Sequence, residues 1–226
     1  MRAAHFCNSC GHVQPPRPVD YFSFFGLLAK LNVDAAQLER EFYKLSRKLH
    51  PDLAARHGNR EQEWSLEQTS QLNDAYRTLK DPISRTEYLL KLEGVHLEEQ
   101  SKSATDAARE TGGTKMQVVP PELLEEVFEL NMQLEEARMN KKMGEHDDNL
   151  DRELRQTKHN LQQKYDGLMS ELNGYWDEWD ALVDRFHAGE DISADRARVR
   201  DKLVGLLNRR TYIRNLLRDV DEVLDV

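Results

Sequence analysis

The chain has 226 residues, of which 38% are hydrophobic and 32% charged, and its formal net charge at pH 7 is −9. This length suits one or two domains with a packed core, and the few glycines (11) and prolines (7) favour a mostly helical protein. The acidic balance disfavours nucleic-acid binding, which needs a basic surface, and no apolar run approaches the length of a membrane span.

A short arm, residues 1–18, comes first and ends in a proline-rich linker. Its Cys7 and Cys10 form one Cys-x-x-Cys pair, for which three roles are open. A structural zinc site needs four ligands, so His5 and His12 would have to complete the pair, or two chains would have to share the metal. A redox role is the second interpretation, although the βαβ context of thioredoxin-like pairs is missing. A pair without function is the third.

Residues 19–96 carry the pattern of a small helical domain. We expect four helices in it, over residues 20–28, 34–49, 61–80 and 83–93. Asp20 and Asp34 precede the first two and are suited to cap them, because a short carboxylate accepts the free N–H groups of a first helical turn. Residues 53–60 are predicted to form a polar loop between the second and third helices.

The helix over 34–49 is amphipathic and ends in a distinctive tripeptide. Its apolar face has residues at helical spacing, namely Leu38, Phe42, Leu45 and Leu49. A basic face lies away from it, formed by Arg40, Lys44, Arg47 and Lys48. His50, Pro51 and Asp52 follow directly. Because proline lacks an N–H group and its ring clashes with the preceding turn, the helix must stop there and present an imidazole and a carboxylate on a rigid base.

The C-terminal half is predicted to be a separate bundle. Residues 97–118 have the composition of a linker, with little apolar content. Residues 119–226 contain the excess acidic charge and three long helical patterns separated by short turns. The first pattern begins near Pro121, the second ends near His187 and the third begins near Ser193. Short turns between long helices favour antiparallel neighbours, so we predict a three-helix bundle and an all-α protein.

These motifs together resemble a J domain, the four-helix module that activates DnaK-type chaperone ATPases. The resemblance includes the apolar stripe of the second helix, the His50–Pro51–Asp52 tripeptide and a later set: Leu72, Ala75, Tyr76, Leu79, Asp81, Pro82 and Arg85. The cysteine arm, the Asp20–Tyr21–Phe22 start and the acidic bundle are more specifically similar to the HscB family, J-type co-chaperones of iron–sulfur cluster assembly. Some members carry two Cys-x-x-Cys pairs before the J domain, and this sequence matches the second pair alone.

The resemblance implies a co-chaperone that stimulates the ATPase of a DnaK/HscA-type chaperone and delivers an IscU-type scaffold to it for cluster transfer. The implied chaperone-binding residues are His50, Pro51, Asp52, Lys44, Arg47 and Lys48. Asp52 would pair with a partner arginine and bias the chaperone toward its hydrolysing state, while the three cations would set the rate of encounter. The alternative is a plain helix stop beside a solvated basic face.

The family's scaffold-binding surface lies on the first bundle helix with a contribution from the last. In this sequence it maps to Leu124, Glu125, Phe128, Glu129 and Tyr212. Residues four apart share a helix face, so these side chains would make an apolar patch beside an acidic one. The alternative is that Leu124, Phe128 and Tyr212 are bundle core. Better core candidates on the first helix are Leu123, Val127, Leu130 and Leu134.

Two rival hypotheses remain open. One is a J-domain co-chaperone for a different client, with the C-terminal bundle as an interaction or dimerisation module. The other is a thiol or metal enzyme that uses Cys7 and Cys10; we expect no enzyme, because no catalytic motif is recognisable. We expect no required cofactor besides the zinc candidate, no nucleic-acid or membrane partner, and a monomer or weak dimer. No presequence is visible, so we expect the bacterial cytoplasm, with the mitochondrial matrix as the alternative.

Overall fold

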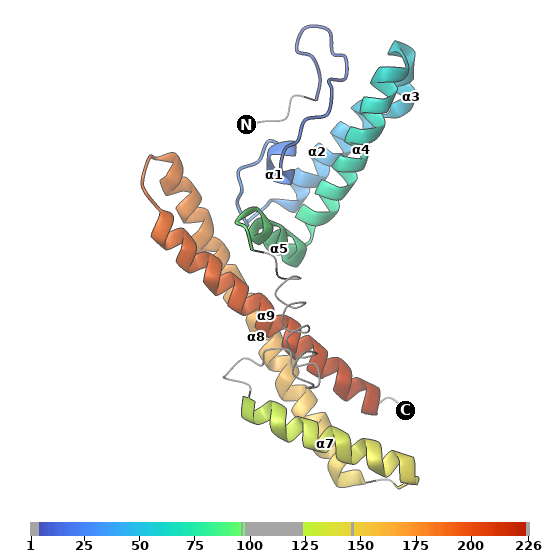
Figure 1. Ribbon diagram of the computed structural model, residues 1–226, viewed down its shortest axis with the longest axis vertical. Helices are drawn as coiled ribbons and strands as arrows, with labels where there is room; N and C mark the ends of the chain where they lie inside the picture. Colours follow the sequence, from blue (N-terminus) through green and yellow to red (C-terminus); the bar gives the residue numbers. More distant parts are fainter. Residues whose placement is uncertain (1–4, 96, 98–123, 146, 225–226) are drawn as a thin grey trace, which may run out of the picture. The chain divides into compact units, whose positions relative to one another are not determined.

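Figure 1 shows the computed structural model, which describes residues 5–95, 97, 124–145 and 147–224. The regular elements in these residues are helices, apart from one isolated antiparallel bridge between Phe6 and Val13, so the all-α prediction is confirmed. The chain divides into two compact units. The first is Met1–Val95 with Trp176–Arg196, and the second is His96–Tyr175 with Ala197–Val226. Among the described helices, none has the length and apolar character needed to cross a bilayer.

Helix α1 (Tyr21–Phe24) is shorter than the predicted span of 20–28. Asp20 caps it as expected, with its carboxylate accepting the N–H of Ser23 at 2.9 Å. The helix ends early because Gly26 adopts a φ of 67°, which glycine tolerates and other residues rarely adopt. The N–H groups of Gly26 and Leu27 then satisfy the carbonyls of the last turn, as in a Schellman motif.

Helix α2 (Ala35–Lys48) confirms the predicted amphipathic helix, with the Asp34 carboxylate accepting the N–H of Gln37 at 3.0 Å. The stripe that faces inward includes Leu38, of which 2% is exposed. The helix ends at Lys48, and Leu49 caps it directly before the tripeptide, which agrees with the stop that the proline requires.

The prediction of a polar loop over 53–60 is wrong. A short helix α3 (Pro51–Ala54) and a 3-10 turn η1 (Ala55–His57) occupy most of it. Pro51 takes the first helical position of α3, where its missing N–H costs nothing and its fixed φ is already helical. The proline that ends α2 therefore begins the next helix.

Helices α4 (Asn59–Lys80) and α5 (Pro82–Leu92) complete the domain. Gly58, with a φ of 117°, lets the chain reverse before α4. Asp81 separates α4 from α5, and its carboxylate accepts the N–H of Ser84 at 2.7 Å. The helix boundaries at this junction agree with the prediction to within a residue.

The core of the first unit includes the N-terminal arm. Its central cluster consists of the buried side chains Val13, Phe24, Leu49, Ala54 and Leu72. Gln68 on α4 links the arm to the helices, because its Nε2 donates to the Gln14 carbonyl at 2.6 Å and its Oε1 meets His5 Nδ1 at 2.8 Å. The arm is therefore packed as part of the helical domain, whereas the sequence suggested a separate appendage.

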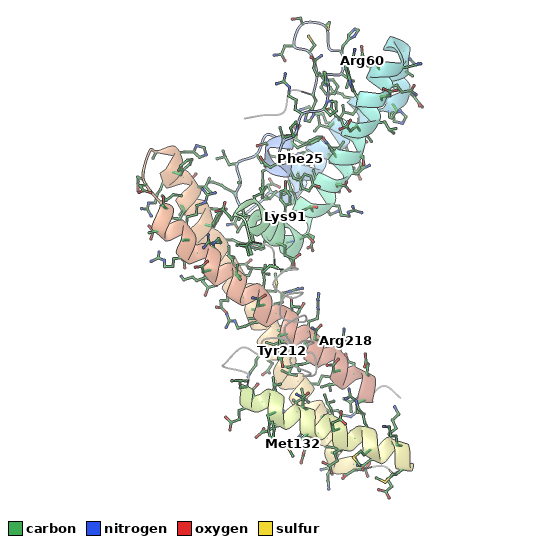
Figure 2. The ribbon with its side chains drawn as sticks, in the orientation of Figure 1. Phe25, Arg60, Lys91, Met132, Tyr212 and Arg218 are labelled. Carbon is green, nitrogen blue, oxygen red and sulfur yellow. The ribbon has the colours of Figure 1, made fainter. Side chains whose placement is uncertain are left out.

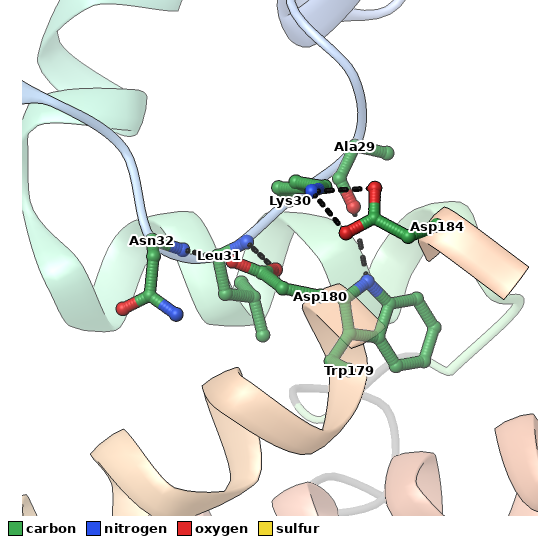
Figure 3. Close-up of polar contacts among 7 residues, drawn as sticks. All are labelled: Ala29, Lys30, Leu31, Asn32, Trp179, Asp180 and Asp184. Carbon is green, nitrogen blue, oxygen red and sulfur yellow. Dashed lines mark hydrogen bonds and ion pairs between the residues drawn. The ribbon is translucent and has the colours of Figure 1, made fainter. Parts of the chain in front are cut away.

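The turn between α8 (Asp148–His187) and α9 (Ser193–Leu224) also belongs to the first unit, through the segment Trp176–Arg196. Figure 3 shows this segment meeting the loop between α1 and α2. The Trp179 indole donates to the Ala29 carbonyl at 3.0 Å, and Trp179 is 1% exposed. The sequence assigned all of 119–226 to the bundle, so this attachment of the hairpin tip is a structural finding.

The second unit contains α7 (Leu124–Met143) with the remaining parts of α8 and α9. Its buried side chains come from all three helices and include Val127, Leu130, Leu134, Leu154, Leu161, Leu168, Leu172, Leu203 and Leu206. An ion pair between Lys164 and Glu126 joins α8 to α7, and one between Arg209 and Glu171 at 2.7 Å joins α9 to α8. The predicted three-helix packing is confirmed. Pro121, Leu123 and residues 98–118 of the predicted linker lie outside the described residues.

Candidate functional site

His50, Pro51 and Asp52 lie at the start of α3. The His50 imidazole caps this helix, with Nδ1 accepting the N–H of Asp52 at 3.3 Å. The chain just before it is held by α4, because the hydroxyls of Ser65 and Thr69 donate to the Leu49 carbonyl at 2.5 and 2.9 Å. The tripeptide therefore has a fixed base, since both of its anchors are hydrogen bonds from partly or fully buried side chains.

The polar ends of this tripeptide face solvent. The His50 side chain is 57% exposed and the Asp52 side chain 87%. The Asp52 carboxylate lies 3.7 Å from His50 Nδ1, too far for a strong contact, so it retains free lone pairs for an external donor. A rigidly mounted, exposed carboxylate is suited to pair with a cation on another protein.

The basic face of α2 runs up to this carboxylate. Lys44, Arg47 and Lys48 are exposed, as predicted. Lys44 already contacts Glu41 at 3.1 Å, and Lys48 lies over the Phe6 ring of the arm with its Nζ 5.8 Å from the centroid. Arg47 makes no ion pair within the described residues, so it is the cation of this face with the most freedom to bind a partner.

One residue on this face was missed by sequence reasoning. Tyr43, adjacent to Lys44, is 53% exposed, although most of the aromatic side chains on α1, α2 and α4 are more buried. Its position off the apolar stripe of Leu38, Phe42 and Leu45 was the available signal. Exposed tyrosines surrounded by charge are frequent anchors in protein interfaces.

The predicted scaffold-binding residues on α7 are at the surface. Leu124 is 55% exposed and Phe128 67%, whereas Val127 and Leu130 are 5% and 1% exposed. Of the two interpretations for Leu124 and Phe128, bundle core is therefore excluded. Glu125 and Glu129 are also exposed, and neither makes an ion pair with another described residue.

The apolar stripe on α7 extends further than predicted. Three methionines continue it, with Met132 60%, Met139 58% and Met143 61% exposed; Figure 2 labels Met132. The spacing of four between Phe128 and Met132 was a signal in the sequence. Exposed methionines are flexible and polarizable, which suits contact with a surface of variable shape.

Tyr212 differs from the other predicted residues of this surface. It lies on α9 (Figure 2), where it is 8% exposed, and burial together with the nearby Asp219 raises the pKa of its hydroxyl. The structure therefore places Tyr212 among the buried side chains of the second unit and not on the exposed patch with Phe128. Its direct role in binding stays a prediction.

The Cys-x-x-Cys pair lies in the turn of the arm. The Cys7 N–H donates to the His12 carbonyl at 2.8 Å, and the Gly11 N–H donates to the Cys7 carbonyl at 2.9 Å. Hydrogen bonding from the Cys10 and Ser9 backbone lowers the pKa of the Cys7 thiol from 9.0 to about 7. Thiolates of this kind bind soft metals and react with electrophiles.

The two histidines beside this pair are engaged elsewhere. His5 uses both ring nitrogens, Nδ1 with Gln68 at 2.8 Å and Nε2 with the Phe24 carbonyl at 2.9 Å. His12 contacts Glu61 through Nδ1 at 2.7 Å. Both ring nitrogens of His5 are thus engaged, and the described residues contain no cluster of three potential ligands. A four-ligand zinc site completed by these imidazoles stays a prediction. A metal shared by two chains stays a prediction.

The sequence is similar to those of known J-domain proteins, in agreement with the geometry of this site. The sequence model of the DnaJ domain matches residues 20–88. The iron–sulfur cluster co-chaperone protein HscB homolog of Arabidopsis thaliana is 37% identical over 133 residues, which cover 58% of this chain and 47% of that protein. The iron–sulfur cluster co-chaperone protein HscB of Mus musculus is 32% identical over 141 residues, covering 62% and 54%.

A bacterial relative and a solved structure extend the comparison. The co-chaperone protein HscB homolog of Shewanella halifaxensis is 40% identical over 88 residues, covering 39% of this chain and 51% of that protein. The chain thus spans about half the length of the curated relatives that it matches. The crystal structure of the human co-chaperone protein HscB has the same fold, with a TM-score of 0.58 and 20% identity over 96% of this chain and 90% of that one. The chain therefore carries a DnaJ domain over residues 20–88, and in its sequence and its fold it is similar to the HscB family of J-domain co-chaperones.

Proposed function

We propose that the protein is a non-enzymatic co-chaperone that stimulates ATP hydrolysis by a DnaK/HscA-type chaperone and brings an IscU-type iron–sulfur scaffold to it. The observation that carries the proposal is the exposed Asp52 carboxylate, 87% accessible on a base held by Ser65 and Thr69, within a matched DnaJ domain. The names of the relatives, iron–sulfur cluster co-chaperones, supply the link to cluster assembly.

The chaperone step follows from charge and rigidity. Lys44, Arg47 and Lys48 attract an acidic surface and raise the rate of productive encounter. Asp52 then pairs with an arginine of the partner. A ligand shifts a conformational equilibrium only by its differential affinity for the two states, so this contact must be stronger in the state that hydrolyses ATP. Because the backbone that carries Asp52 is already fixed, binding costs little conformational entropy, and more of the contact energy is available to distinguish the two states of the chaperone.

The scaffold step uses α7. Leu124 and Phe128 offer apolar area to a partner, and Glu125 and Glu129 beside them favour a partner with basic side chains. A second candidate is a J-domain co-chaperone for a different client, with the bundle as an interaction or dimerisation module. The exposed methionines extend the apolar stripe of α7 beyond the predicted scaffold-binding patch. This longer apolar surface supports the second candidate, because it offers contact area to a different client.

Single-turnover ATP hydrolysis by the host's DnaK-type chaperones tests the proposal, with and without the scaffold. We expect stimulation that increases with scaffold and disappears in Asp52→Asn. Asp74→Asn, a change of an exposed carboxylate on α4, is the matched control and should keep full stimulation. Failure to stimulate any host chaperone contradicts the proposal, and stimulation that ignores the scaffold favours the second candidate.

A further inference from the structure

The Leu49 carbonyl lies at the junction between α2 and α3, and two hydroxyl groups of α4 hold it. Ser65 donates to this oxygen at 2.5 Å and Thr69 at 2.9 Å. A carbonyl oxygen has two lone pairs, so these donors use both of them. Leu49 and Ser65 are each 0% exposed, which leaves water little access to replace a missing hydroxyl. The position of this carbonyl therefore depends on the two side chains.

The two hydroxyls do not make the hydrogen bond that serine and threonine commonly make inside a helix. That bond goes to the carbonyl four residues earlier, and Thr86 on α5 makes it with Pro82 at 2.8 Å. Ser65 and Thr69 instead reach a carbonyl 16 and 20 positions earlier in the sequence. Two donors from successive turns of α4 thus converge on one acceptor outside their own helix, which fixes the backbone of another element.

The junction turns the chain between two carbonyls that face different helices. The Leu49 carbonyl accepts from α4, whereas the His50 carbonyl accepts two N–H groups of α3 at 2.9 and 3.3 Å. Between them His50 has an extended backbone, with φ −64° and ψ 126°, and Pro51 fixes the next φ. The direction in which Asp52 is presented therefore follows from the orientation of the Leu49 carbonyl.

We infer that Ser65 and Thr69 are positioning residues for ATPase stimulation, because they aim the Asp52 carboxylate through the Leu49 carbonyl. The inference rests on the proposed co-chaperone function and gives a role in it to two side chains that lie outside the exposed basic face. That face attracts the chaperone with or without the hydroxyls. A loosely held carboxylate, in contrast, distinguishes the two states of the chaperone less well. Docking and stimulation should therefore separate when the hydroxyls are removed.

The first measurement is single-turnover ATP hydrolysis by the host's DnaK-type chaperones at increasing concentrations of the co-chaperone. The double variant Ser65→Ala/Thr69→Val removes both donors and changes the shape of the side chains little. Its maximal stimulation should fall by about tenfold, the effect of losing one hydrogen bond to a charged group, while its half-saturating concentration stays unchanged. Thr69→Ser keeps a donor and should keep full stimulation.

The matched control is Thr86→Val, which removes a fully buried hydroxyl from α5 in the same unit. Melting curves set an assay temperature at which every variant is folded. At that temperature the control should stimulate like wild type, because its hydroxyl does not contact the junction.

A second measurement uses the full chain and needs no chaperone. NMR order parameters of the Asp52 and Leu53 amides should lie near the rigid value of about 0.85 in wild type and in Thr86→Val, and fall toward about 0.6 in the double variant. If wild type stimulates no host chaperone, the proposed function fails, while these order parameters still decide whether the hydroxyls position Asp52. The inference is overturned by unchanged order parameters in the double variant, by undiminished maximal stimulation, or by a loss that comes only from a higher half-saturating concentration.

Discussion

The carboxylate of Asp180 on α8 accepts hydrogen bonds from the backbone N–H of Leu31 at 2.6 Å and of Asn32 at 3.0 Å. These two N–H groups belong to the loop between α1 and α2, where no helix supplies backbone carbonyls to accept their hydrogen bonds. Lys30, one residue earlier, pairs with Asp184 at 2.7 Å on the same face of α8 (Figure 3). The hairpin tip thus satisfies the polar groups of a loop whose Leu31 is fully buried.

Asp180→Ala should lower the free energy of unfolding by about 1–3 kcal/mol, because two backbone donors lose their acceptor and one of these hydrogen bonds, from Leu31, is partly buried. Urea unfolding followed by far-UV circular dichroism measures the change. Asp184→Asn is the matched control, since its side chain is 64% exposed and a surface ion pair contributes at most about 1 kcal/mol. Equal effects of the two substitutions would contradict this account of the contact.

Phe128→Ala should weaken scaffold binding without destabilising the chain, because 67% of Phe128 is exposed. Leu130→Ala, two residues on, removes a side chain that is 1% exposed and should lower the free energy of unfolding by about 2–5 kcal/mol. Isothermal titration with the scaffold, together with a melting curve of each variant, separates binding from stability. Unchanged scaffold affinity in Phe128→Ala would move the binding surface away from this patch.

Reversing the charge of Lys44, Arg47 and Lys48 to glutamate should reduce the association rate with the chaperone by about tenfold at low salt, because steering charges act mainly on encounter. The difference from wild type should shrink as ionic strength rises and the Debye length falls. Stopped-flow binding at several salt concentrations measures both. The same reversal at the exposed Lys91 on α5 serves as the control and should leave the rate unchanged.

Cys7 should react with iodoacetamide at lower pH than an ordinary thiol. Because hydrogen bonds from the Cys10 and Ser9 backbone lower its pKa to about 7 from 9.0, the reactive thiolate fraction rises through neutral pH and is nearly complete by pH 8. Alkylation rates of the Cys10→Ser variant against pH give the midpoint, since residue 10 keeps its backbone N–H. A midpoint at the usual thiol value would show that the turn does not hold these bonds in solution.

The amino-acid sequence alone determined the helices and the candidate chaperone site. The stripe of Leu38, Phe42 and Leu45 and the proline at position 51 act through local spacing and local sterics, so α2 and its end could be predicted. The same steric argument predicted that the Asp52 carboxylate would be presented at the end of α2. The short helix α3 was missed because a proline that ends one helix also suits the first position of the next.

Tertiary packing decided the rest. Leu124 and Phe128 have the same spacing as core residues, and whether they face solvent depends on which side of α7 the other helices cover. Spacing alone suggested His5 and His12 as metal ligands, and only the fold shows that Gln68 and the Phe24 carbonyl engage both ring nitrogens of His5 while Glu61 engages Nδ1 of His12. Asp180 reaches Leu31 across 149 positions of sequence. Such contacts depend on packing between segments far apart in the chain, which local periodicity does not encode.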